Sequence, residues 1–141
     1  MKLRVRRTSP RAVIPRYAHP GDSGLDLHAC LDGDILIPSG AVRLIGTGVA
    51  FEIPDGFEGQ VRGRSGHSKR GILVHGGTID APYRGEVKVC IQNLSPNTIT
   101  IEPGERVAQI VIAPVARVEL VEVDALSESE RGEGGFGSTG R

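Results

Sequence analysis

The sequence contains no tryptophan and few other aromatic residues, with 3 Phe and 2 Tyr among 141 residues. Because aromatic side chains are so scarce, any one that lies in a polar stretch is a candidate for a binding role. The chain also lacks an excess of either charge, since 17 Lys and Arg residues balance 17 Asp and Glu residues. That balance excludes a bulk electrostatic attraction to nucleic acid or to an anionic membrane. We expect neither as a partner.

Cysteine is also rare, with only Cys30 and Cys90, each in a short apolar run. There is no Cys-x-x-Cys pair and no His/Cys cluster, which argues against a structural zinc site. No apolar segment of a secretion signal follows the N-terminal charges, and no apolar run is long enough to cross a bilayer. Two thiols without a secretory context are expected to stay reduced. We therefore predict a cytoplasmic protein.

Glycine and proline, by contrast, are plentiful, with 20 Gly and 9 Pro. They separate short segments rich in Val and Ile, a pattern typical of many short strands joined by turns. The segments expected to form strands are 2–7, 25–31, 35–38, 42–45, 48–53, 57–64, 72–75, 86–92, 98–101, 107–115 and 118–123. One short helix is expected at 65–71, with Ser65 as its N-cap and Gly71 as its end. The length is most simply that of one all-β domain.

The stretch 76–86 (GGTIDAPYRGE) is the first candidate for a site. Its glycines let the backbone approach a ligand closely. Asp80 and Tyr83 lie there on a tight excursion between two predicted strands, and the alternating segment 86–92 would support that excursion rigidly. The alternative is an ordinary surface turn in which Asp and Gly only serve the turn geometry.

Three other positions place polar groups at or within predicted strands. Arg64 and Ser65 lie where a strand meets the helix, so a guanidinium, a hydroxyl and free backbone N–H groups converge, as an oligophosphate requires. Alternatively, Ser65 is only a cap and Arg64 a surface charge. Asp26 lies between two leucines and therefore faces the opposite side of its strand. Gln109 lies in an apolar strand and, taken alone, is consistent with a hydrogen-bonded core or interface amide.

The composition changes at residue 127. Segment 127–141 has too little apolar area to pack and too much glycine for a helix or strand, so we expect a flexible arm. Its glycine loop lacks the Lys, the preceding strand and the following helix of a P-loop. What remains is Phe136, able to stack on a base, with hydroxyls, backbone N–H groups and two Arg residues for phosphate oxygens. The alternative is a plain linker, in which an aromatic side chain would have no task.

Five blocks of the sequence resemble, in order, the five motifs of the trimeric dUTPase family (deoxyuridine 5′-triphosphate nucleotidohydrolases). The blocks are 23–27 (SGLDL), 64–66 (RSG), 77–86 (GTIDAPYRGE), 103–109 (PGERVAQ) and 131–140 (RGEGGFGSTG). Each block is weak alone, but all five in order form a specific signature. The resemblance implies a jelly-roll-like β-barrel over residues 1–126 that forms a homotrimer. It also implies that the arm, 127–141, closes over a neighbouring subunit's active site.

The resemblance further implies hydrolysis of dUTP to dUMP and pyrophosphate, which keeps uracil out of DNA and supplies dUMP for thymidylate synthesis. Mg²⁺ is the implied cofactor, held mainly by the triphosphate, with Asp26 acting on it through water. Asp80 matches the carboxylate that deprotonates the attacking water. Tyr83 matches the aromatic that packs under the sugar and leaves no room for a 2′-OH.

The other substrate contacts are likewise implied by the family's motifs. The hairpin backbone that reads the uracil edge corresponds to Gly77, Thr78 and Ile79, and Lys88 lies near the nucleotide. The triphosphate cradle corresponds to Arg64, Ser65, Gly66 and Gln109. The arm's substrate-binding residues correspond to Arg131, Phe136, Gly137, Ser138 and Thr139, with Phe136 stacked over uracil and Arg131, Ser138 and Thr139 on the β and γ phosphates.

Three features depart from the family pattern. Gly63 stands where Pro usually precedes the Arg of the second motif, and Pro82 stands where Asp usually precedes the Tyr of the third. The run 73–77 is short and lacks an Asn that often contacts the base, a role left to His75 or a backbone group. Two alternatives follow: a dCTP deaminase of the same fold, or a non-catalytic nucleotide-binding module. The phenylalanine-containing arm and the intact third motif favour the hydrolase.

Overall fold

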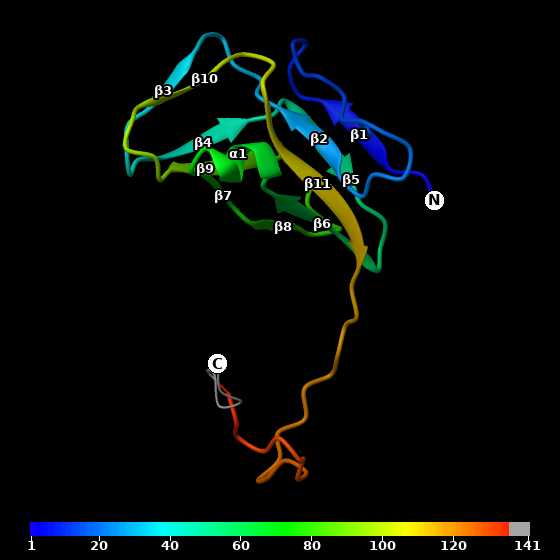
Figure 1. The fold of residues 1–141 in the computed structure, drawn as a ribbon. Helices are drawn as coiled ribbons and strands as arrows, with labels where there is room; N and C mark the ends of the chain where they lie inside the picture. Colours follow the sequence, from blue (N-terminus) through cyan, green and yellow to red (C-terminus); the bar gives the residue numbers. More distant parts are fainter. Residues whose placement is uncertain (136–141) are drawn as a thin grey trace.

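The structure, a computed structural model, describes residues 1–135. These residues form short strands and one helix, which confirms the predicted all-β fold (Figure 1). The strands are β1 (Arg4–Arg7), β2 (Leu25–His28), β3 (Ile35–Ile37), β4 (Val42–Gly46), β5 (Val49–Glu52), β6 (Phe57–Arg62), β7 (Ile72–His75), β8 (Gly77–Ile79), β9 (Lys88–Asn93), β10 (Ile99–Ile101) and β11 (Arg106–Pro114). The helix is α1 (Ser65–Lys69). No helix in this described part is long and apolar enough to span a membrane.

The strands pair in four antiparallel sheets. The largest has the order β2-β11-β6-β8, so β11 lies inside it, and the second has the order β4-β9-β7. The remaining sheets are the pairs β1-β5 and β3-β10. The expectation of a barrel is corrected here: across residues 1–135 the hydrogen-bonded ladders stop at the sheet edges and do not close on one another. The sheets instead pack around a shared core.

Alternation of apolar and polar residues builds that core. Along β9, Val89 and Ile91 are fully buried while Lys88 is exposed, because successive side chains of a strand point to opposite faces. The largest fully buried apolar side chains are Leu27, Ile37, Ile45, Val49, Ile72, Val87, Val89, Ile91, Ile101, Val107 and Ile110. They come from all four sheets and belong to one cluster.

Three local expectations are wrong. Residues 77–79 form strand β8 against β6 and are not part of a loop. The N-cap of α1 is Arg64, which makes no side-chain capping bond, so Ser65 is the first residue of the helix. Residues 118–123 form no strand, because no other described strand lies beside them to accept their backbone hydrogen bonds. The helix does end as predicted, before Gly71 with a φ of 75°.

Asn93 is the last residue of β9, and its polar side chain is fully buried. Its Nδ2 donates to the carbonyl oxygens of Ile37 and Asn97, at 2.8 and 2.7 Å. Its Oδ1 accepts from the backbone N–H and the hydroxyl of Ser95, at 2.9 and 2.7 Å. The amide therefore satisfies buried groups of β3 and of the loop after β9, and holds the two together.

We expect Asn93→Ala to lower the free energy of unfolding by roughly 2–4 kcal/mol, because it leaves several buried polar groups without partners. Urea unfolding at fixed protein concentration measures this. Asn97→Ala is the matched control, since only the backbone oxygen of Asn97 is used, and it should change stability by less than about 0.5 kcal/mol. Equal effects of the two substitutions would contradict the assignment.

Candidate active site

A cavity of about 340 Å³ lies between the loop before β2, the start of α1 and strand β11. We call it the arginine pocket. It is lined by Ala18, His19, Asp22, Ser23, Gly24, Asp26, Arg64, Ser65, Gly66, Arg106 and Gln109. Five residues predicted from separate motifs thus come together in one place: Asp26, Arg64, Ser65, Gly66 and Gln109.

The carboxylate of Asp26 lies between two guanidinium groups. Its Oδ1 is 3.3 Å from Nε of Arg64, and its Oδ2 is 3.3 Å from Nη1 of Arg106. The Asp26 side chain is only 14% exposed, whereas that of Arg106 is half exposed. The carboxylate of Asp22 also lines the pocket, so its two guanidinium groups are balanced by two carboxylates. The guanidinium N–H groups can still donate to an anion with several oxygen atoms.

Gln109 is held in the arginine pocket by the backbone around it. Its Nε2 donates to the carbonyl oxygen of Gly63 at 2.9 Å. A Cβ at Gly24 would lie 2.2 Å from Oε1 of Gln109, so only glycine leaves room for this side chain. The amide therefore ties β11 to the segment that enters α1. Gly63, which stands where the family usually has Pro before the second motif, is thus fixed by the hydrogen bond that its carbonyl oxygen accepts from Gln109.

A second cavity, of about 320 Å³, lies beside the loop that follows β8. We call it the hairpin pocket, lined by Leu44, Thr78, Ile79, Asp80, Tyr83, Glu86 and Lys88. The Tyr83 hydroxyl donates to the carbonyl oxygen of Glu86 at 3.1 Å. A Cβ at Gly85 would lie 2.3 Å from that hydroxyl, so glycine allows the ring to fold back over the loop. This pocket offers a carboxylate and an aromatic ring to a ligand.

The arginine pocket and the hairpin pocket share no lining residue. Their separation follows from strand register: Ile79 lies opposite Gly59, and Gln109 lies opposite Arg62 on the other side of β6. Three residues along β6 correspond to about 10 Å, and the two strand spacings add about 4.8 Å each. Within the described chain, Asp80 and the cradle around Arg64 therefore open into different hollows.

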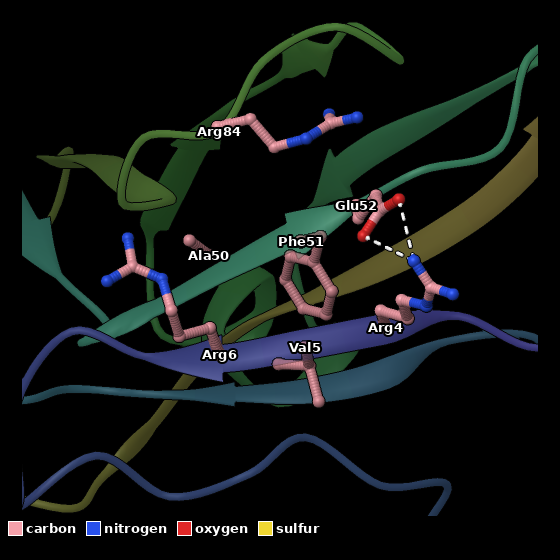
Figure 2. Close-up of a pocket in the computed structure, with 7 residues that line it drawn as sticks. All are labelled: Arg4, Val5, Arg6, Ala50, Phe51, Glu52 and Arg84. Atoms are coloured by element: carbon pink, nitrogen blue, oxygen red, sulfur yellow. Dashed lines mark hydrogen bonds and ion pairs between the residues drawn. The ribbon is translucent and has the colours of Figure 1, made fainter.

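A third hollow, of about 190 Å³, lies along β1 and β5 and contains none of the predicted site residues. Figure 2 shows Arg4, Arg6 and Arg84 around it, with Phe51 between the strands. Nη1 of Arg4 is 3.1 Å from Oε1 of Glu52, so one of its arginines is already paired with a carboxylate. We assign the site to the other two pockets because they contain the predicted residues.

Comparison with known proteins agrees with this geometry. A family model described as dUTPase matches residues 11–140. The chain belongs to the dUTPase family. The deoxyuridine 5′-triphosphate nucleotidohydrolase of Neorickettsia sennetsu is 51% identical over 130 residues, covering 90% of this chain and 87% of that protein. The enzyme of the same name from Nautilia profundicola is 49% identical over 144 residues and covers both chains fully.

Solved structures of dUTPases also match. The dUTPase of Staphylococcus bacteriophage 80alpha with dUPNHPP is 32% identical, has a TM-score of 0.93 and covers 99% of both chains. A mutant dUTPase from phage phi11 of S. aureus, described as coordinating a structural Mg(II) ion, is 26% identical with a TM-score of 0.84. That match covers 91% of this chain and 100% of the phage chain. The jelly-roll-like fold implied by the resemblance is thus confirmed.

The structure places most predicted site residues of this dUTPase-family chain in one of the two pockets. Gly77 lies in β8 but lines neither pocket. Arg131 lies in the exposed segment after β11, where its Nε donates to the carbonyl oxygen of Gly134 at 2.7 Å. The remaining arm positions, Phe136, Gly137, Ser138 and Thr139, lie outside the described residues. The structure shows where the described residues lie, and the roles of all the predicted site residues remain predictions.

Several lining residues were not predicted. They are Ala18, His19, Asp22, Ser23, Gly24 and Arg106 in the arginine pocket and Leu44 and Glu86 in the hairpin pocket. Arg106 and Glu86 belong to motif blocks, so their charges were a usable signal. His19 and Asp22 lie in a turn, where the carboxylate of Asp22 accepts from the His19 N–H at 2.8 Å. Nothing in the sequence distinguishes that turn from any other.

No cluster of three or more His, Cys, Asp or Glu side chains within residues 1–135 is arranged to hold a metal ion. The single carboxylate of Asp26 is already paired with two arginines. This donor set fits Mg²⁺ only if most ligands come from elsewhere, since Mg²⁺ is commonly bound by one or two carboxylates, water and substrate phosphates. The predicted water-mediated role of Asp26 is compatible with these contacts.

His67 is a buried titratable residue close to the arginine pocket. Burial lowers the pKa of His67 below the ordinary value of 6.5, and the neighbouring Glu105 opposes this in part. Arg64 and Arg70 lower the pKa further. The folded protein therefore favours the neutral imidazole at neutral pH.

The lowered pKa of His67 predicts that stability falls as the pH drops below about 6.5. In that range the unfolded chain binds a proton that the folded chain does not, at a cost of up to about 1.4 kcal/mol per pH unit. Unfolding measured at pH 7.5, 6.5 and 5.5 would show this loss. His67→Leu should reduce the slope without removing it, because burial also lowers the pKa of His28, and His19→Gln, at an exposed site, is the matched control. An unchanged slope in His67→Leu would contradict the prediction.

Proposed function

We propose that this chain hydrolyses dUTP to dUMP and pyrophosphate, which keeps uracil out of DNA and supplies dUMP for thymidylate synthesis. The observation that carries the proposal is the pair of pockets. The arginine pocket offers two guanidinium groups, a hydroxyl and an amide to an oligophosphate, and the hairpin pocket offers a carboxylate and an aromatic ring to a nucleoside. Because the chain belongs to the dUTPase family, we take dUTP as the nucleotide whose triphosphate and nucleoside would occupy these two pockets.

Phosphoryl transfer depends mainly on positioning and on charge stabilisation, with little covalent chemistry required of the protein. In the proposed mechanism, Asp80 accepts a proton from water as that water attacks the α-phosphorus. The hydroxyl of Tyr83 donates a hydrogen bond to the carbonyl oxygen of Glu86, which fixes the ring. The ring packs under the deoxyribose and excludes a 2′-OH. The backbone of residues 77–79 reads the uracil edge, and Lys88 lies at the same pocket.

The phosphates are proposed to occupy the arginine pocket. Arg64 and the N–H groups and hydroxyl at the start of α1 would bind their oxygen atoms, and Gln109 would add an amide. Mg²⁺ bound to the triphosphate supplies charge that offsets the developing negative charge. Asp26 would reach that ion through water. The arm residues Arg131, Phe136, Gly137, Ser138 and Thr139 are proposed to close over uracil and the outer phosphates.

We propose that the active site is completed by assembly as a homotrimer, with the arm, 127–141, closing over a neighbouring subunit. Two observations support this: the separate pockets, and an exposed apolar face on the β4-β9-β7 sheet. On that face, Val42 and Leu73 flank Gln92, and Leu44 lies in the next row beside Cys90. Leu44 also lines the hairpin pocket, so the face adjoins the site. Large exposed apolar patches mark interfaces.

The proposed compartment is the cytoplasm. Both Cys30 and Cys90 are free thiols. Free thiols persist in a reducing compartment.

Pyrophosphate release tests the proposed reaction. With Mg²⁺, we expect release from dUTP and not from dTTP, dCTP or UTP. Asp80→Asn should lower turnover at least about 100-fold, because it removes the general base, while binding of a non-hydrolysable dUTP analogue is kept. Near-normal turnover by Asp80→Asn would show that the base is another group. Ammonia release from dCTP would instead support the deaminase alternative.

Assembly is tested separately. Leu73→Glu places a charge on the proposed interface without altering either pocket, and we expect it to yield monomers in sedimentation analysis, because a buried unpaired charge is costly. Leu36→Glu is the control: Leu36 is 61% exposed, against 42% for Leu73, but lies on the β3-β10 sheet. A trimer that survives Leu73→Glu, or that Leu36→Glu breaks equally, would place the interface elsewhere.

A further inference from the structure

Helix α1 supplies Ser65 and Gly66 to the arginine pocket but has little to hold it in place. It spans five residues and has no side-chain N-cap. A helix this short is not stable by itself, so its position depends on tertiary contacts. Its one buried residue is His67, which points away from the pocket surface into the protein.

The imidazole of His67 contacts Glu105 in the turn before β11. The distance from Nε2 of His67 to Oε1 of Glu105 is 3.4 Å, and the two side chains are 6% and 24% exposed. Glu105 is itself fixed, because its Oε2 accepts from the backbone N–H of Glu102 at 3.0 Å. Its carbonyl oxygen accepts from the N–H of Ala29 at 2.8 Å. His67 therefore attaches α1 to a rigid turn.

That turn leads directly into the opposite wall of the arginine pocket. Arg106 follows Glu105, and Gln109 is three residues further along β11. The contact between His67 and Glu105 thus joins the two walls from behind. At the pocket surface the walls are joined by two other contacts. Arg64 pairs with Asp26, and Gln109 donates to the carbonyl oxygen of Gly63.

The surroundings of His67 fix its protonation. Its Nδ1 is buried and has no hydrogen-bond partner among the described residues. A proton on Nδ1 would be a buried donor without an acceptor, which is costly. The neutral ring with its proton on Nε2, facing Glu105, avoids that cost. The charged groups around it are Glu105, Arg64 and Arg70.

We propose that His67 is a positioning residue for the phosphates of the substrate. Through Glu105 it sets the spacing between the wall that carries Ser65 and Gly66 and the wall that carries Arg106 and Gln109. This inference rests on the proposed function, in which the phosphates occupy the arginine pocket. Because the hairpin pocket shares no residue with that pocket, the nucleoside end of the substrate should not depend on His67.

The test compares His67→Leu, which has similar bulk but no donor, with His67→Gln, which keeps a donor toward Glu105. We expect His67→Leu to lower kcat/KM for dUTP by about 10- to 100-fold, since small misplacements of binding groups have effects of that size. Its affinity for a non-hydrolysable dUTP analogue should fall, while its affinity for dUMP stays within about twofold of the original. His67→Gln should recover kcat/KM to within about threefold.

Glu105→Gln provides the second arm, because it keeps the shape but has one acceptor oxygen, which cannot accept from both His67 Nε2 and the Glu102 N–H as the two carboxylate oxygens do. The double variant His67→Leu/Glu105→Gln should be no worse than His67→Leu, since both changes break one contact. If His67→Leu fails to fold, the comparison of dUTP analogue and dUMP binding in Glu105→Gln carries the test.

Equal losses of dUMP and analogue binding, failure of His67→Gln to recover activity, or additive effects in the double variant would overturn the inference. The outcomes separate it from the proposed function. If the unmodified protein does not hydrolyse dUTP, the proposed function fails. If it does so and His67→Leu is unchanged, only the role of His67 fails.

Discussion

The pairing of one carboxylate, Asp26, with two guanidinium groups is the interaction on which the arginine pocket depends. Asp26 lies on β2, Arg64 at the entry to α1 and Arg106 at the start of β11, so a single side chain brings three elements together. Two like charges held this close would repel each other without the carboxylate between them. Burial of that carboxylate strengthens both contacts, and the half-exposed guanidinium of Arg106 keeps N–H groups that can donate to an anion.

Strand β11 carries the structural part of this arrangement. It pairs with β2 on one side and with β6 on the other, so it holds the first and fourth motif blocks beside the strand that leads into the second block. Close packing permits this only where side chains are missing, as at Gly24, where any Cβ would collide with Gln109. Packing therefore requires glycine at positions 24 and 85 of the motifs, whereas a Cβ at Gly66 or Gly77 would meet nothing within 4 Å.

Most of the predicted site residues of one chain are divided between two pockets that share no residue. A substrate with a nucleoside at one end and phosphates at the other needs both pockets within its own length. The described chain holds them on different strands with no shared residue, while it leaves an apolar sheet face and the segment after β11 exposed. The proposed completion of the site by other copies of the chain would account for all three features.

The all-β class, most strand positions and the family could be predicted from the sequence, because strand alternation and turn residues are local and five motif blocks occur in order. The same blocks identified Asp26, Arg64, Asp80, Tyr83 and Gln109 as candidates. Which of these side chains meet could not be predicted. Asp26 and Arg106 are 80 residues apart, and their contact depends on strand register, in which a shift of one residue would turn the side chains to the other face. The contact between His67 and Glu105, the separate pockets and the absence of a strand at 118–123 arise in the same way, from which segments fold against one another.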